Sequence, residues 1–203
     1  MRLSHSFIEM EGTNIVGSKI MKAYETNTEP AHSGLRPRYE TRGPMLIAGL
    51  HGHYTFATLD DIPALWARFA PHIGNVPGQL GEADFGLCID MLAGTDGFDY
   101  VAGVEVDDLS NLPSGWAGVR IPAQSYAIFP HDGHVSTIRD TARRIGEEWL
   151  PESGREPAQT PLGQPNLIER YGREFDPTTG TGDIELWLPI RHEGDALAAL
   201  QIS

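Results

Sequence analysis

The chain has 203 residues with a formal net charge of −13, and 40% of the residues are hydrophobic. This composition predicts a soluble globular protein, and we place it in the cytoplasm because no apolar run resembles a signal sequence or a membrane span. The acidic balance disfavours nucleic acid as a partner, since phosphate binding needs a clustered basic surface. Cys88 is the single cysteine, so no internal disulfide is expected.

Residues 1–35 combine weak periodicity with polar runs, which predicts an N-terminal extension rather than a folded unit. Residues 36–203 are predicted to form one domain. No helix-turn-helix pattern is found in either part. We therefore expect a stand-alone domain that does not bind nucleic acid directly.

The first half of the domain begins with a buried strand, predicted at residues 45–50. The helix that follows has two aspartates at its start and Pro63 in its first turn, where a missing backbone N–H costs nothing. Its apolar stripe consists of Ile62, Leu65, Trp66 and Phe69. Two strands, residues 84–91 and 98–106, complete this half.

The second half repeats the order. Strands are predicted at residues 116–121 and 125–129. The next helix has an apolar face made of Ile138, Ala142, Ile145 and Trp149. A connection rich in glycine and proline leads to two last strands, residues 166–171 and 183–190. Corresponding segments of the two halves lie about eighty residues apart.

A duplicated strand-helix-strand-strand unit predicts a single α+β fold with pseudo-twofold symmetry. We expect an antiparallel sheet with two helices packed on it, because each half of the sheet needs a helix to cover one face. The seam between the halves is the expected position of a cleft.

Glu169 lies in the middle of the predicted strand 166–171, on the same face as Leu167 and Tyr171. Burying an ionised carboxylate on an apolar face costs several kcal/mol of folding free energy, unless the group is paired or protonated. Proteins keep such an acid where it meets a ligand or takes part in chemistry. In the alternative interpretation, Glu169 points to solvent and Ile168 faces the core.

The order of elements resembles the GyrI-like small-molecule-binding domain, the fold of AraC-type effector-binding domains that serve transcription regulation. The resemblance covers about residues 37–190 and includes the strand with Glu169 and Tyr171, an acidic loop, and the closing sequence Ile-Glu-Leu-Trp-Leu-Pro-Ile. In that family a central glutamate projects into an aromatic pocket and neutralises cationic, apolar ligands, as in multidrug recognition. The resemblance implies that Glu169 has this role here, with Tyr171 beside it.

A pocket for flat, lipophilic or cationic molecules needs aromatic walls, because ring faces supply both contact area and cation–π attraction. The predicted ligand-binding residues are Glu169, Tyr171, Trp66, Trp116, Tyr126 and Phe129. Tyr126 and Phe129 fall on opposite faces of their strand, so a regular strand brings only one of them to the pocket.

Two functions fit this site. The first is a binding protein that senses or sequesters a small molecule, without a cofactor, as a monomer or a homodimer. The alternative is a GyrI-like hydrolase that opens strained rings of reactive natural products. Glu169 would then be the general base, and Tyr171 or Tyr126 the hydrogen-bond donor. We favour binding, since one acid and several aromatic residues are all that points to catalysis.

A metal site is the third hypothesis. His51 and His53 precede the first helix, and His131 and His134 occupy the corresponding turn of the second half. This spacing suits metal ligation. No acid or thiol is placed to complete the ligand set, so we predict no metal.

Overall fold

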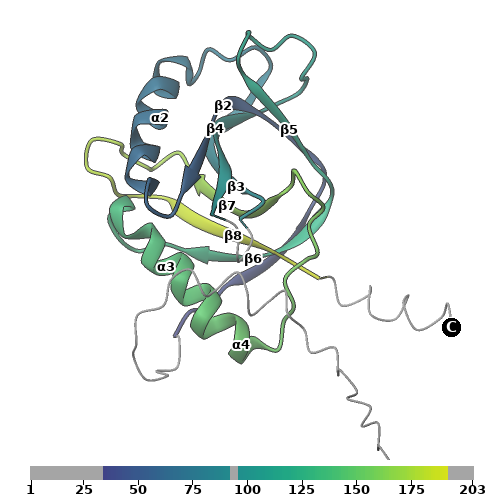
Figure 1. Ribbon diagram of the computed structural model, residues 1–203, viewed down its shortest axis with the longest axis vertical. Helices are drawn as coiled ribbons and strands as arrows, with labels where there is room; N and C mark the ends of the chain where they lie inside the picture. The colour runs from purple at the N-terminus through teal and green to yellow at the C-terminus, as the bar shows by residue number, and fades with distance from the viewer. Residues whose placement is uncertain (1–33, 92–95, 192–203) are drawn as a thin grey trace, which may run out of the picture.

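The computed structural model describes residues 34–91 and 96–191, and the predicted extension, residues 1–35, falls outside this part apart from its last two residues. An antiparallel 8-stranded sheet curls on itself, and two helical segments cover its outer side (Figure 1). The strands are β1 Arg38–Arg42, β2 Met45–Thr55, β3 Gln79–Ile89, β4 Gly97–Val106, β5 Ala117–Ile121, β6 Gln124–Pro130, β7 Pro165–Tyr171 and β8 Ile184–Ile190.

The strand order is β1-β6-β8-β7-β3-β4-β2-β5. It is symmetric about its centre, because corresponding strands of the two halves lie at equal distances from the middle of the sheet. Strands β2, β3 and β4 of the first half correspond to β6, β7 and β8 of the second, and the β3–β7 pair is the seam. The first strand of each half pairs with a strand of the other half: β1 pairs with β6, and β5 pairs with β2. The predicted α+β fold, an antiparallel sheet carrying two helices, is confirmed.

The first helix, α2, spans Ile62–Phe69 after a 3-10 turn at Leu59–Asp61, with Pro63 in its first turn. The second helical segment runs from α3, Ile138–Arg144, through a π-helical turn, Ile145–Trp149, into α4, Leu150–Ser153. Pro151 lies just after the π turn and lacks the N–H that a regular ladder would need, which favours the irregular turn there.

The two faces of the sheet carry two separate cores. The helix-covered core includes Phe69, Phe129 and Trp149. The inner core includes Tyr126 from β6 and Val119 from the opposite edge strand β5, so the curl of the sheet brings its two ends together. Strand alternation assigns each side chain to one of the two cores.

Glu185 of β8 is the most enclosed acid of the inner side, with 9% of its surface exposed. Arg38 of β1 donates to the Glu185 carboxylate from both terminal nitrogens, at 2.6 and 3.2 Å, and the Trp187 indole N–H donates to it at 2.9 Å. Burial alone would raise the pKa of Glu185, but the hydrogen bonds from Arg38 and Trp187 outweigh it and hold the pKa below its usual value. The pair thus fastens β1 to the second half.

We expect Glu185→Gln to lower the free energy of unfolding at pH 7 by about 1–2 kcal/mol, because Arg38 and Trp187 lose an anionic acceptor. The folded-state pKa of Glu185 is lowered, so its stabilisation is present above the ordinary pKa of 4.5 and is lost as the pH falls through the folded-state value. Urea denaturation at pH 7 and at pH 3 measures both effects. Equal stability of the two proteins at pH 7 would contradict this role.

Candidate ligand-binding site

A cavity of about 310 Å³ lies over the β3–β7 seam, between that seam and the two helices. We call it the helix–sheet cavity. Its volume falls at the lower end of the range of small-molecule sites. It is walled mainly by apolar side chains from α2, α3 and the strands, among them Ile62, Trp66, Cys88, Phe98, Ile138, Ala142 and Leu167.

The seam places one acid at the floor of this cavity. Strand alternation turns Leu167, Glu169 and Tyr171 toward the helices, as predicted, and the β3–β7 register sets Gly86 opposite Glu169. A side chain at position 86 would not fit, since a Cβ there would collide with the Tyr100 hydroxyl and lie 2.6 Å from Glu169 Oε2. The glycine on β3 therefore makes room for the carboxylate of β7.

Two tyrosines hold the carboxylate of Glu169. Tyr100 of β4 donates its hydroxyl to Oε2 at 2.6 Å, and Tyr171 donates to the same oxygen at 2.8 Å. The indole N–H of Trp66 donates in turn to the Tyr100 hydroxyl at 3.0 Å, so α2 fixes the orientation of that donor. Among the described residues, none donates a hydrogen bond to the other oxygen, Oε1. Within the described part of the chain, only Oε2 of this carboxylate is hydrogen-bonded.

No cationic side chain of the described residues pairs with Glu169 in the cavity. Burial raises the pKa of Glu169, and the hydrogen bonds from Tyr100 and Tyr171 offset only part of that rise. Burial, and next the nearby Glu169, raise the pKa of both tyrosines well above the usual value, so both remain hydrogen-bond donors. Arg139 lines the cavity but pairs with Asp60 at 2.6 Å.

The structure brings together three of the predicted site residues, Glu169, Tyr171 and Trp66. The rings of Trp66 and Tyr171 meet edge to face at 5.2 Å. The side chain of Trp66 is only partly buried, although it lies on the apolar stripe of α2, because its free face borders the cavity.

The other three predicted residues lie away from the cavity. Tyr126 points into the inner core, where its ring packs against Trp187 at 5.4 Å. Phe129 faces the helices but packs against Trp149 at 4.8 Å, under the second helical segment. Trp116 packs against Phe69 at 5.6 Å, at the far end of α2. The alternation of side chains along a strand fixes the face of the sheet on which a residue lies, but not its position on that face.

Sequence reasoning missed Tyr100 and Cys88, which both line the cavity. A tyrosine in the middle of the apolar strand 98–106 was the available signal, because a buried phenol needs a hydrogen-bond partner. For the Cys88 thiol, burial raises the pKa well above its usual value, and Glu169 adds to this, so the group stays protonated. It contributes as a small apolar wall residue.

Three of the four histidines of the metal hypothesis, His53, His131 and His134, make hydrogen bonds within the protein. His131 is buried, with Nδ1 2.8 Å from the Thr141 hydroxyl and Nε2 3.1 Å from the carbonyl of His134. His53 Nδ1 lies 2.8 Å from Asp99. Within residues 34–91 and 96–191, no group of three His, Cys, Asp or Glu side chains is arranged to hold a metal ion.

With this geometry in place, comparison with known proteins identifies the family. Residues 38–190 match the family described as Cass2, integron-associated effector binding protein. The chain belongs to this family. The match spans nearly all of the described residues, and the predicted GyrI-like resemblance is confirmed. Members of an effector-binding family bind small molecules, which agrees with a cavity at the seam.

A curated regulator and several solved structures are similar to this chain. The transcriptional regulator BrlR of Pseudomonas aeruginosa is 29% identical over 157 residues, 77% of this chain, and the chain spans only 56% of that regulator. The structure of SAV2435 bound to tetraphenylphosphonium has a TM-score of 0.60 at 16% identity and covers 77% of this chain and 94% of its own. The integron cassette protein VCH_CASS2 from the Vibrio cholerae mobile metagenome has a TM-score of 0.51 at 16% identity, over 77% and 97% of the two chains. The solved structures establish the shared fold.

In the part of the chain that the structure describes, the helices are too short and too polar to cross a bilayer.

Proposed function

We propose that this domain binds lipophilic organic cations in the helix–sheet cavity, with Glu169 as the counter-charge. The observation that carries the proposal is the carboxylate itself, held through Oε2 by two tyrosine hydroxyls with Oε1 free toward an apolar cavity. A cation at Oε1 would relieve the cost of burying the acid.

The walls favour one class of cation. An ammonium with a tight hydration shell loses more on entering an apolar cavity than a cation whose charge is spread over carbon groups. The faces and edges of Trp66, Phe98 and Tyr171 supply apolar contact area, and the aromatic faces also attract a cation. The fold shared with a protein solved with tetraphenylphosphonium supports the same class.

The similarity to a regulator indicates what the binding is for. BrlR is a transcriptional regulator, and its matched part corresponds to this domain. We propose that this domain senses or sequesters its ligand. The alternative of a ring-opening hydrolase with Glu169 as general base receives no support from the comparisons.

The charge selectivity is tested with two ions of the same shape, tetraphenylphosphonium and tetraphenylborate. At a hundredfold excess over its dissociation constant, a ligand stabilises the fold by about 2.7 kcal/mol, so we expect the cation to raise the melting temperature by about 5–10 °C. The borate anion should give no rise, because its charge repels Glu169. Equal shifts with both ions, or none with the cation, would contradict the proposal.

A further inference from the structure

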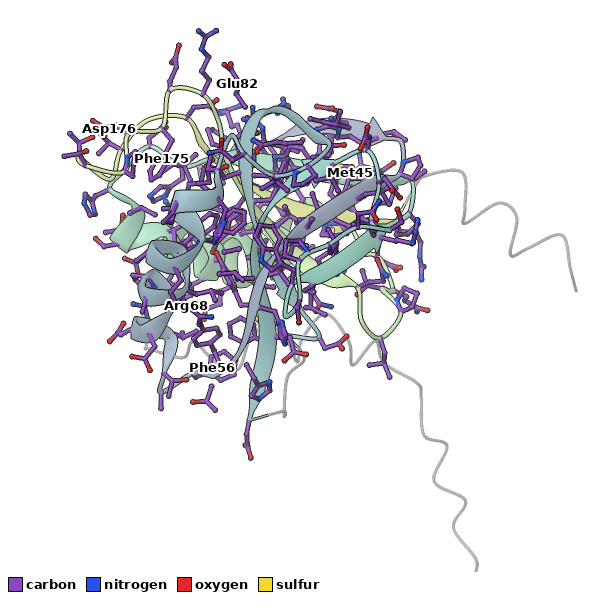
Figure 2. The ribbon with its side chains drawn as sticks, turned by 90° about the horizontal axis from the view of Figure 1, so that it is seen from above. Met45, Phe56, Arg68, Glu82, Phe175 and Asp176 are labelled. Atoms are coloured by element: carbon purple, nitrogen blue, oxygen red, sulfur yellow. The ribbon has the colours of Figure 1, made fainter. Side chains whose placement is uncertain are left out.

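A second cavity of about 580 Å³ adjoins the first. It lies between α2, the start of β3 and the segment that follows β7, and we call it the Asp84 cavity. Trp66 and Tyr171 line both cavities, together with Pro63 and Val135, so this aromatic pair is part of their common wall. Glu82 and Phe175, both labelled in Figure 2, also line the Asp84 cavity.

Asp84 is the acid inside this cavity. It lies on β3 opposite Tyr171, two residues before Gly86, and therefore on the same face of the sheet as Glu169. Diagonal neighbours of this kind have Cα atoms about 7–8 Å apart. The two acids thus lie on the same face of the seam, and each lines a different cavity.

One oxygen of Asp84, Oδ1, is buried without a hydrogen-bond partner among the described residues. Burial raises the pKa of Asp84 to about 6, so the carboxyl is ionised at pH 7.5. The other two charged residues that line this cavity pair with each other, since Arg173 lies 3.3 Å from Glu82 and both side chains are mostly exposed. The remaining titratable group that faces the cavity is Tyr171, which donates to Glu169.

An unpartnered carboxylate oxygen makes the ionised Asp84 costly, and a positive charge in the cavity that this residue lines would compensate it. Glu169 presents the same situation on the other side of the aromatic wall. Two unpaired acids, with a Trp–Tyr pair between them, match a flat molecule that carries positive charge at both ends.

We propose that the two cavities together take one aromatic dication, with one cationic centre at Glu169, the other at Asp84, and its rings against Trp66 and Tyr171. This inference rests on the proposed function, since it assigns the first centre to the same glutamate. It adds a second charge-recognition residue and makes dications the preferred substrate class.

A matched pair of probes tests this. Methyl viologen and N-methyl-4-phenylpyridinium are biaryls of similar shape that carry two charges and one. By calorimetry on the full chain at pH 7.5, we expect the dication to bind at least about tenfold more tightly, because a second charge pair adds more than 1.4 kcal/mol. Asp84→Asn should lower dication affinity about tenfold and leave monocation affinity within about twofold, which also shows that the variant is folded.

Two further variants separate the outcomes. Glu169→Gln should weaken both probes, and Glu82→Gln, which removes a charge from an exposed, paired side chain of the Asp84 cavity, should change neither by more than about threefold. If Asp84→Asn leaves dication affinity unchanged while Glu169→Gln weakens both probes, the inference is overturned and the proposed function stands. If Glu169→Gln weakens neither probe, the proposed function itself fails.

Proton linkage gives an independent readout. At pH 6 a cation at Asp84 favours the ionised carboxyl, so dication binding releases protons. The release is measured from the dependence of the calorimetric heat on the ionisation enthalpy of the buffer. It should be larger for the dication than for the monocation, and the difference should vanish in Asp84→Asn. An unchanged difference in that variant would contradict a contact with Asp84.

Discussion

Glu169→Gln is expected to lower the affinity for tetraphenylphosphonium at least thirtyfold, roughly 2 kcal/mol, at pH 7.5. The amide keeps the shape of the side chain, and its oxygen still accepts from Tyr100 and Tyr171, so the walls stay in place. What is lost is the charge that faces the cavity. Calorimetric titration of both proteins with the same ion measures the change directly.

The stability of this variant is not expected to fall together with its affinity. Because the pKa of Glu169 is raised in the folded state, the fold prefers the protonated acid, and the ionised form destabilises it as the pH rises above the ordinary value of 4.5. The neutral glutamine escapes this cost. We therefore expect Glu169→Gln to be at least as stable as the wild type at pH 7.5 and to lose binding nevertheless. Binding sites commonly trade stability for function in this way.

Glu185→Gln is the matched control. It also replaces a carboxylate of the sheet by an amide, but Glu185 is paired with Arg38 and hydrogen-bonded to Trp187 of the inner core. This variant should lose stability and keep its affinity within about twofold. A destabilised Glu169→Gln protein with unchanged affinity would make Glu169 a structural acid instead.

The sequence allowed the acid to be found because its position broke a local rule. A glutamate between Leu167 and Tyr171, on the apolar side of an alternating strand, stands out in a single segment. Trp66 was found from the apolar stripe of its helix. Local periodicity is enough for such residues, because it fixes the face on which they lie.

What local periodicity does not fix is the neighbour across the sheet. Tyr100 reaches Glu169 from β4, two strands away from β7, and only the register of β3 with both strands reveals the contact. The polar edge strand β1 escaped prediction because Arg38–Arg42 has no apolar alternation, and its pairing with β6 depends on the exchange between the halves. Such pairings are tertiary and carry no signal in one segment.

Gly86→Ala tests whether this register builds the site. The added methyl would press on the Tyr100 hydroxyl and come within 2.6 Å of Glu169 Oε2. Tyr100 has little room to retreat, since it is 1% exposed and its hydroxyl also accepts from Trp66. We expect a loss of about 1–3 kcal/mol in the free energy of unfolding, measured by urea denaturation, as for other overpacked cores. Gly43→Ala, where the methyl meets nothing within 4 Å, should change stability by less than about 0.5 kcal/mol.

Binding should suffer through the displaced tyrosine. If Tyr100 moves, Glu169 loses one of its two donors and its pKa rises further. We therefore expect tetraphenylphosphonium affinity to fall, and to fall more at low pH than at high pH, because a higher pKa leaves less of the acid ionised as the pH decreases. The double variant Gly86→Ala with Tyr100→Phe removes the hydroxyl, which is the closest atom to the added methyl, so it should regain part of the stability but not the affinity. A double-mutant cycle without such coupling would mean that residue 86 acts independently of Tyr100. Recovery of stability alone would instead show that the glycine is kept for the hydroxyl that orients the acid.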